Sequence, residues 1–379
     1  MYSSLLHCLN KRKAYLDNPS GWRWVLRDPV VGCFAPALYQ LEKDGEIQLS
    51  SEEHTTYESL YWQNTVLNIR RQYKLGPTLE KLANENIDVI PLKGAALLDT
   101  IFENIGLRVM TDVDILVPQE DYLRAAGILL NQGFQPNWSY PSGDLFEFVS
   151  WPVKYWPGEL SFTDGEGLHV DLHCDLVTYH WFKVPFPMDM EIVWNRTVQL
   201  EYPSASGGVS LWKTYLSSYD MLAHMCLHLA LHGMQIMKNL WDVDLFLRTL
   251  PEDWDWRKYI EIAEISGLKS ASYHAFLFCQ EIFKTHIPEY VMHVLQPAGF
   301  DCWQVRKLIT PQDLISNKNT LGKRYPTLVK FALFDNTNVK LRTIKNLVIT
   351  DSDWLEHQYL YRNIFGHWHH ILRVLLRGD

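Results

Sequence analysis

The chain has 379 residues, of which 47% are hydrophobic and 21% are charged, and this composition is typical of folded proteins and excludes a largely disordered one. Its length allows two or three domains. A formal net charge of −9 argues against broad binding to a long nucleic acid, because such binding depends on Lys and Arg contacts with phosphates.

The six cysteines show neither a CxxC motif nor zinc-site spacing, and they lie at Cys8, Cys33, Cys174, Cys226, Cys279 and Cys302. We interpret them as reduced, mostly buried thiols of a cytosolic protein. The first residues lack an apolar core of signal-peptide length, and no apolar run approaches the roughly 18 residues of a membrane helix. We therefore expect a cytoplasmic protein without a membrane span.

Residues 1–86 are expected to form an N-terminal helical region. Ser50 to Glu53 provide a capping signature for a long helix that continues to Asn86. Apolar residues then follow at nearly helical spacing, at Val66, Ile69, Tyr73, Leu79 and Leu82. We expect this helix to serve packing rather than chemistry.

Residues 87–117 predict a strand, a tight turn, a helix, a loop and a second strand. Ile87–Leu92 is an apolar run of strand length, Lys93 and Gly94 interrupt it, and a helix-prone segment begins at Ala95. The second strand is Thr111–Val117. This order places Lys93 and Gly94 at a strand-to-helix turn, where backbone N–H groups can bind an anion such as the phosphates of an NTP.

The second strand carries two acidic residues, Asp112 and Asp114, separated by one position. Side chains alternate along a strand, so both carboxylates project from one face while Val113 and Ile115 enter the core. Two neighbouring anions repel each other and need a counter-charge, which a divalent cation supplies. The pair therefore predicts a metal site.

A third acidic residue follows in the same block, which we assign to residues 87–205. A helix is expected at Tyr122–Asn131, followed by alternating segments at Leu145–Val149 and Val153–Trp156. A hairpin is then expected around Asp164–Gly167. In its second strand Asp171 shares a face with two histidines, His169 and His173, which are candidates for orienting it. The resulting fold class is α+β, with a mixed sheet flanked by helical regions.

Residues 206–379 read as a C-terminal helical domain. Ser217–Asp220 cap a segment that is apolar nearly all round and therefore predicted to be buried. It carries three histidines on one stripe, His224, His228 and His232. Such histidines either bind a metal or line the nucleotide or acceptor cleft, and the second interpretation is favoured because no carboxylate close in sequence completes a metal site.

A second acidic pair, Asp242 and Asp244, lies within a segment of helical apolar spacing. Residues two apart on a helix point in nearly opposite directions. The pair is therefore not expected to chelate a metal, and a cap or a salt bridge is the better interpretation of each carboxylate.

Asp112, Asp114 and Asp171 together can hold two Mg²⁺ ions about 3.5–4 Å apart, the spacing used for in-line displacement at phosphorus. Lys93 adds a positive charge that suits a triphosphate. Arg108, four residues before Asp112, either contacts a phosphate or the acceptor, or forms a salt bridge with one of these aspartates.

Several segments together resemble one family. The sequences LKGAAL, LRVMTDVDILV and LHVDLH, followed by HMCLHLALH and NLWDVDLFLRTL, resemble the bacterial "uncharacterised nucleotidyltransferase" family of the polymerase-β-like superfamily. The resemblance extends over most of the chain. It implies a nucleotidyltransferase-like fold in which Asp112 and Asp114 bind Mg²⁺ or Mn²⁺ and Asp171 is the third carboxylate and base. Lys93 and Gly94 stand where the superfamily usually has Gly-Ser.

The resulting hypothesis is a nucleotidyltransferase that moves an NMP from an NTP such as ATP onto a hydroxyl or phosphate of a small-molecule or peptide acceptor and releases pyrophosphate. One alternative is a metal-dependent glycosyltransferase, in which a DxD motif holds a nucleotide sugar. Such enzymes place the motif after a long α/β segment, whereas the motif here follows residues 1–86, which look helical. The other is a catalytically inactive, nucleotide-binding regulatory protein. An aromatic loop would suit a partly apolar acceptor, with Trp138, Trp151, Trp156 and Trp181.

Overall fold

The structure is a computed structural model. It describes residues 2–16, 20–138, 144–178, 185–199, 212–317, 321–324, 326–335 and 337–348, together with the short pieces 355, 368–369 and 371–372. Within these residues no helix combines the length and the apolar character needed to cross a membrane.

Helices dominate the first 86 residues. They are α1 (Ser3–Tyr15), α2 (Ala35–Lys43) and the 34-residue α3 (Ser51–Asn84), with short 3₁₀ turns at Arg23–Arg27 and Gly32–Phe34. The predicted capping signature is confirmed, because Ser50 and Glu53 exchange side-chain and backbone hydrogen bonds at the start of α3. This reciprocal cap satisfies two of the free N–H groups of the first turn.

A five-stranded mixed sheet follows, in the order β1-β2-β5-β4-β3. Its strands are β1 (Ile90–Pro91), β2 (Val113–Leu116), β3 (Gln135–Pro136), β4 (Glu159–Thr163) and β5 (His169–His173). The central pair, β2 and β5, is parallel, and the other pairs are antiparallel. The α+β fold class is therefore confirmed.

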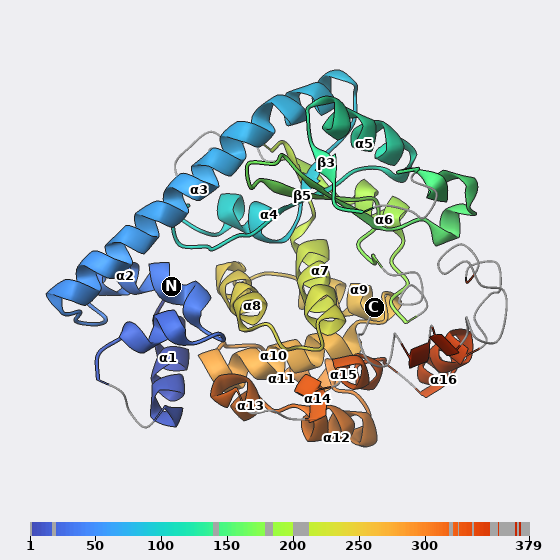
Figure 1. Cartoon of the computed structure of the whole chain (residues 1–379). Helices are drawn as coiled ribbons and strands as arrows, with labels where there is room; N and C mark the ends of the chain where they lie inside the picture. Colours follow the sequence, from blue (N-terminus) through green and yellow to red (C-terminus); the bar gives the residue numbers. More distant parts are fainter. Residues whose placement is uncertain are drawn as a thin grey trace.

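Two helices attach to this sheet near its centre. α4 (Lys93–Thr100) begins directly after β1, and α5 (Tyr122–Asn131) follows a 3₁₀ turn at Gln119–Asp121. The predicted hairpin is confirmed as β4 and β5, with Gly165 and Gly167 at positive φ in its turn. Figure 1 shows the sheet and α5 at the top of the molecule, with α3 running along its outer edge.

The alternating segments before the hairpin do not form strands. They form 3₁₀ turns at Glu147–Ser150 and Val153–Tyr155. Their aromatic side chains, among them Phe148, Trp151 and Tyr155, are buried in the cluster that covers the sheet. In these compact turns apolar side chains make contacts on two sides. The resulting alternation in the sequence looks the same as that of a strand.

The rest of the described chain is mostly helical. A two-stranded sheet, β6 (Val198–Gln199) with β7 (Thr214–Tyr215), follows the short α6 (Met190–Asn195). The remaining helices are α7 (Ser218–Leu231), α8 (Met237–Thr249), α9 (Trp256–Ile265), α10 (Lys269–Phe283), α11 (Glu289–Leu295), α12 (Gly299–Leu308), α13 (Pro311–Ser316), α14 (Leu321–Arg324), α15 (Pro326–Ala332) and α16 (Thr337–Val348).

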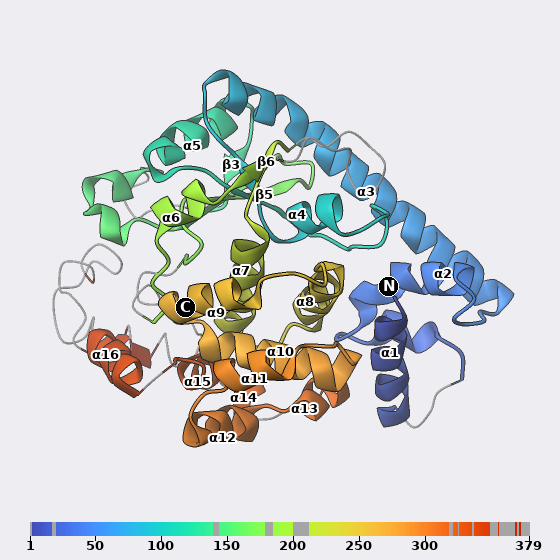
Figure 2. The ribbon, with the colours of Figure 1, turned by 180° about the vertical axis from the view of Figure 1, so that it is seen from behind.

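Two apolar clusters hold these parts together. One unites α1 and α2 with α4, the helices from α7 to α13 and α15, and the other contains most of the sheet, α5 and the last third of α3. Figure 2 shows the helical layer below the sheet from the other side, with α4 and α7 between the two. The three-part division at residues 86/87 and 205/206 stays a prediction, and the second boundary lies outside the described residues.

One expectation for α3 is wrong. Val66, Ile69 and Tyr73 were predicted to pack, yet they are 61%, 52% and 82% exposed. The buried face of the middle of α3 instead carries polar residues, including Asn64 and Asn68. Their amide groups donate to the backbone carbonyls of Gly106, Ile105 and Arg108 in the loop before β2. Satisfied polar groups therefore anchor this helix where an apolar stripe was expected.

Candidate active site

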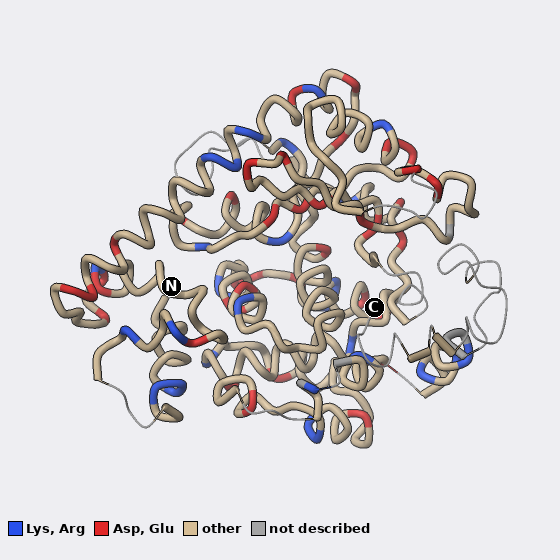
Figure 3. Tube along the Cα trace, in the orientation of Figure 1, with Lys and Arg blue, Asp and Glu red and all other residues tan. Residues whose placement is uncertain are grey.

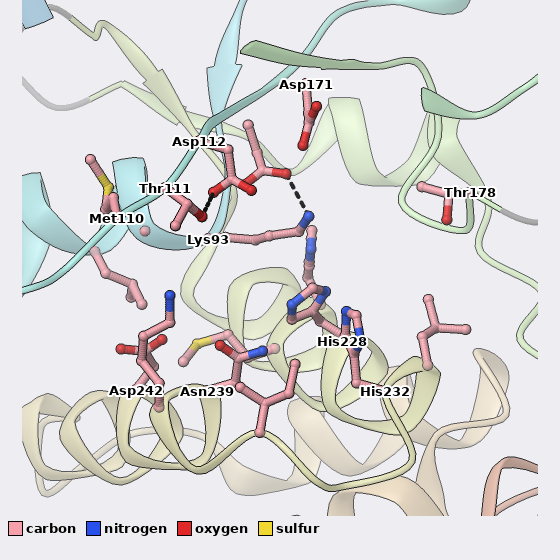
Figure 4. A pocket seen from close by; sticks show the side chains of 18 of the residues that line it. Lys93, Met110, Thr111, Asp112, Asp171, Thr178, His228, His232, Asn239 and Asp242 are labelled. Atoms are coloured by element: carbon pink, nitrogen blue, oxygen red, sulfur yellow. Dashed lines mark hydrogen bonds and ion pairs between the residues drawn. The ribbon is translucent and has the colours of Figure 1, made fainter. Parts of the chain in front are cut away.

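A cavity of about 760 Å³ lies between the sheet and the C-terminal helices. One wall comes from α4, β2, β5 and the loop before β2, and the opposite wall comes from α7, α8 and Lys330 of α15. All six residues proposed from the sequence as site residues line it: Lys93, Gly94, Arg108, Asp112, Asp114 and Asp171. Figure 4 shows Asp112 and Asp171 on the wall opposite His228 and His232, with Lys93 between the walls.

Pairing of β2 with β5 brings the three aspartates together. Asp114 and Asp171 are register partners on these parallel strands, so their side chains leave the sheet on the same face. Asp112 lies two residues before Asp114 and lines the same cavity, whereas Val113 and Ile115 are buried in the core as predicted. The pairing of β2 with β5 thus brings Asp114 and Asp171, which are far apart in the sequence, to neighbouring positions.

The carboxylate of Asp114 contacts a lysine and a histidine. Its Oδ1 lies 2.5 Å from Lys93 Nζ and 3.0 Å from His173 Nε2. Burial opposes the charge of this carboxylate, but Lys93 and His173 outweigh burial and hold its pKa well below the usual range. In turn, burial of Lys93 is outweighed by Asp114, which raises the pKa of the lysine. Both groups are therefore charged.

Asp171 has a different environment. Burial raises its pKa to about 6, with further contributions from Glu159 and Asp114, although Ser161 Oγ donates a hydrogen bond to its Oδ1 at 2.5 Å. His173 was expected to orient Asp171, but it contacts Asp114 instead, and His169 is exposed. A carboxylate with a pKa near neutrality is suited to accept a proton.

The turn at Lys93 and Gly94 has an unusual backbone. Lys93 adopts φ of +47°, a left-handed conformation that side chains with a Cβ seldom adopt. At the next position a Cβ would lie 2.8 Å from Met110 Sδ, so any larger residue than glycine would require the Met110 side chain to move. The turn directs Lys93 to Asp114 and keeps the cavity wall compact.

Arg108 forms a salt bridge, but with a partner that the sequence did not predict. Its guanidinium donates two parallel hydrogen bonds to Asp242 of α8, from Nε at 2.7 Å and from Nη2 at 2.6 Å. Both side chains are almost fully buried, and a bidentate pair of this kind is directionally specific. The predicted role of Arg108 in binding a phosphate stays a prediction.

The two carboxylates of the second acidic pair point to different partners, as expected for residues two apart on a helix. Asp242 faces the cavity and Arg108, whereas Asp244 accepts hydrogen bonds from Ser4, Thr285 and Arg248. Residues two apart on a helix diverge in this way. Both carboxylates are therefore structural partners of basic or hydroxyl groups.

The three histidines of α7 line the wall opposite the aspartates. Burial lowers the pKa of all three histidines: to about 3 for His224, to about 4 for His232 and well below the usual value for His228. The nearby charge of Lys93 lowers each of these pKa values further. They are thus neutral imidazoles that can donate and accept hydrogen bonds. His224 Nδ1 has no hydrogen-bond partner among the residues that the structure describes.

The described tryptophans of the aromatic loop do not line the cavity. Trp138, Trp151 and Trp156 pack with the cluster on the sheet, and Trp181 lies outside the described residues. No Phe, Tyr or Trp is found among the described residues that line the cavity. The expectation of an aromatic acceptor cleft is therefore wrong for the described part of the site.

The sequence did not indicate several polar residues that line the cavity, among them Glu159 of β4, Thr178, Lys238 and Lys330. Register could have revealed one of them, because Glu159 pairs with His173 across the predicted hairpin. Lys238 and Lys330 carry no local signal, since helix packing alone brings them to the cavity.

The donor chemistry of the aspartate wall suits a hard divalent cation, which prefers carboxylate oxygens and water. The three carboxylates line one cavity wall, and Asp112 and Asp171 are only half-buried. In this conformation Lys93 and His173 occupy one oxygen of Asp114, and no ready-made group of three His, Cys, Asp or Glu ligands occurs in the described parts of the chain. The residue types thus suit such an ion, although Lys93 supplies the counter-charge of Asp114 in this conformation.

Comparison with known protein families supplies the remaining observation. The model of the "Uncharacterised nucleotidyltransferase" family matches residues 23–284, which is more than half of the chain. The chain belongs to this family. The matched range includes the sheet, the aspartate wall and the α7 and α8 wall of the cavity. A search of curated proteins found no match. Nucleotidyl transfer is accordingly the general function of this family member.

Proposed function

We propose that the protein transfers an NMP from an NTP to a polar small-molecule or peptide acceptor in a metal-dependent reaction that releases pyrophosphate. The observation that carries this proposal is the register pairing of Asp114 with Asp171, with Asp112 on the same cavity wall. Such a set of carboxylates beside a lysine-bearing turn suits phosphates and their cations.

In this proposal Asp112, Asp114 and Asp171 would hold Mg²⁺ or Mn²⁺. The bound ion would supply neutralisation of the charge on the transferring phosphate and on the departing pyrophosphate. Lys93 would exchange Asp114 for a phosphate oxygen of the NTP, since its Nζ lies inside the cavity wall at the strand-to-helix turn. The lysine therefore serves as the resting counter-charge of the site and then as a phosphate ligand.

Asp171 is the proposed base for the acceptor. Its raised pKa, about 6, reflects burial and the neighbouring Glu159 and Asp114, and a pKa near neutrality suits proton transfer. The acceptor would approach from the α7 wall, where neutral imidazoles of His228 and His232 offer hydrogen bonds to a hydroxyl or phosphate group. A polar acceptor agrees with the absence of Phe, Tyr and Trp among the described lining residues.

The test combines ligand-induced stabilisation with product release. Wild-type protein and Asp112→Asn are heated with each NTP, with and without Mg²⁺ or Mn²⁺, and pyrophosphate is assayed with candidate acceptors. A ligand at 100 times its dissociation constant adds about 2.7 kcal/mol to the free energy of unfolding. We expect one NTP to stabilise the wild type only with metal, and Asp112→Asn to lose this effect and at least about a hundredfold in turnover.

Asp88→Asn is the matched control, because Asp88 is an exposed carboxylate near β1 and outside the cavity. Lys93→Met should bind metal more tightly and NTP more weakly, which separates its two roles. Full turnover in Asp112→Asn would refute the assignment of the metal ligands. Stabilisation by a nucleotide sugar alone would indicate the glycosyltransferase, and metal-independent NTP binding without pyrophosphate release would indicate an inactive regulatory protein.

A further inference from the structure

One cation of the cavity has no carboxylate partner among the described residues. Lys238, in the first turn of α8, lines the cavity, and its Nζ donates a long hydrogen bond, of 3.4 Å, to the carbonyl of Val109. Asp242 lies on the same face of α8, one turn further on, but both of its oxygens accept hydrogen bonds from Arg108. The ammonium group of Lys238 is therefore not paired with a described carboxylate.

This state of Lys238 is unfavourable for the protein by itself. The side chain is half-buried. Burial and the charge of Arg108 lower its pKa, whereas Asp242 and Asp112 act in the opposite direction. A partly buried charge without a partner costs free energy, and an anion bound beside the ammonium group would offset that cost. Lys238 thus indicates an anion site on the helical wall of the cavity.

This anion site lies at the end of the cavity where α4 begins. A Cβ on Gly94 would lie 2.8 Å from Met110 Sδ and 3.8 Å from Arg108 Nη2, so the strand-to-helix turn contacts the loop before β2. Lys238 reaches the same loop through the carbonyl of Val109. The start of a helix after a strand is itself suited to bind a phosphate. Lys238 and this turn are therefore placed to contact the same ligand.

The aspartate wall faces Lys238 across the cavity. Asp112 is near enough to act on the pKa of Lys238, yet no ion pair joins their two side chains. Figure 4 shows Asp242, which shares its face of α8 with Lys238, on the wall opposite Thr111 and Asp112. Figure 3 shows acidic positions on the sheet strands above α8, which itself carries basic and acidic positions. The space between Asp112 and Lys238 suits a phosphate that meets a cation of the aspartate wall on one side and the ammonium group on the other.

We propose that Lys238 binds the terminal phosphates of the NTP from the wall opposite the aspartates and thereby selects a triphosphate donor. This inference rests on the proposed function. In that reaction the acceptor oxygen bonds to the α-phosphorus, Asp171 takes the acceptor proton, and pyrophosphate leaves with the electron pair of the broken P–O bond. Lys238 neutralises the charge of the pyrophosphate without giving up an ion pair, whereas Lys93 must first leave Asp114.

The other end of the cavity is left for the acceptor. Figure 4 shows Thr178 and His232 on the side of the cavity away from Asp242, and the neutral imidazole of His232 belongs to the proposed acceptor wall. An acidic group of the acceptor would have to pass the phosphates of the NTP to meet Lys238. The experiment separates these two anions.

Calorimetric titrations with ATP, CTP, GTP and UTP, the matching NMPs and pyrophosphate, each with Mg²⁺, test the site. For the NTP that binds the wild type, Lys238→Met should weaken binding about tenfold or more, because a charge-assisted contact is lost. Pyrophosphate should weaken to a similar degree. The matching NMP lacks the terminal phosphates and should bind within about twofold of its wild-type affinity. Lys238→Arg keeps the charge and should retain most of the affinity for the NTP.

Lys258→Met is the matched control, because Lys258 is an exposed lysine in the first turn of α9 and does not line the cavity. It should change none of these affinities. Melting curves without ligand should show that each variant is folded.

The outcomes separate this inference from the proposed function. A wild type that binds an NTP with Mg²⁺, together with equal affinity in Lys238→Met, would overturn the inference and leave the proposed function intact. Lost turnover in a Lys238→Met variant of unchanged NTP affinity would overturn it likewise and assign Lys238 to the acceptor. An equal loss for NTP and NMP would show that Lys238 supports the shape of the cavity instead. A wild type that binds no NTP with Mg²⁺ would overturn both.

Discussion

Lys93 is the residue on which the resting state of the cavity depends. A buried carboxylate without a counter-charge is costly, and Lys93 neutralises Asp114 at 2.5 Å. The lysine adopts a left-handed backbone conformation to do so. Its position in the middle of the aspartate wall explains how three acidic side chains coexist there.

Acid sensitivity is predicted for another single residue, His274, which is fully buried in α10. Burial lowers its pKa to about 4, although its hydrogen bond to the carbonyl of Ser270 opposes this shift. In the unfolded chain a histidine titrates near 6.5, so the unfolded state binds the proton first as the pH falls. Its contribution to stability is therefore complete above about pH 6.5 and lost towards pH 4.

Urea unfolding at pH 7, 5.5 and 4.5 checks this expectation. Between pH 7 and pH 4.5 the free energy of unfolding should fall by about 3 kcal/mol through His274. His274→Gln should remove about this much of the fall. His286→Gln removes an exposed imidazole and serves as the control. An unchanged slope in His274→Gln would show that the group is not held neutral by the fold.

At the scale of elements, hydrogen bonds from buried side chains fix the middle of α3. Asn68 is fully buried, and its Nδ2 donates to the carbonyls of Ile105 at 2.7 Å and Arg108 at 3.0 Å. These contacts hold the loop that leads into β2. The same helix therefore supports the aspartate wall with its polar inner face and presents an apolar outer face.

Replacement of Asn68 by Ala is expected to lower the free energy of unfolding by about 2–3 kcal/mol, because two buried carbonyl groups lose their donor. Chemical denaturation measures the change. Thr55→Ala, at an exposed site on the same helix, should stay within about 0.5 kcal/mol of wild type. A loss in Asn68→Ala no larger than in this control would mean that water replaces the amide without cost.

Across the whole molecule, one buried ion pair joins the loop before β2 to the C-terminal helices. Arg108 and Asp242 are 134 residues apart in the chain, and their side chains are only 4% and 6% exposed. They meet beside the cavity, between the wall formed by the sheet and the wall formed by α8. The pair therefore fixes the distance between the two walls of the site.

Arg108→Met should lower the free energy of unfolding by about 3–5 kcal/mol, because it removes the salt-bridge partner of the buried Asp242 carboxylate. The double variant Arg108→Met with Asp242→Leu should recover most of this loss, since two apolar side chains replace the two charges together. Denaturant titrations of the single and double variants complete a double-mutant cycle. Additive effects in that cycle would contradict a coupled buried pair.

Local features of the sequence determined much of this protein. The Ser50 and Glu53 cap predicted the start of α3, and the glycine turn at residues 164–167 predicted the β4–β5 hairpin. Alternation along β2 predicted that Asp112 and Asp114 face one side while Val113 is buried. These predictions succeeded because hydrogen bonding of caps, turns and strands depends on residues only a few positions apart.

Tertiary structure alone decided the partners of the charged groups. His173 lies on the predicted polar face, yet it pairs with Asp114 because the parallel register of β2 and β5 places it there. Arg108 meets Asp242 only because α8 packs against the loop before β2. The outward turn of Val66 follows likewise from which face of α3 finds hydrogen-bond acceptors. Periodicity defines the faces of an element, but the choice of the buried face depends on contacts between distant residues.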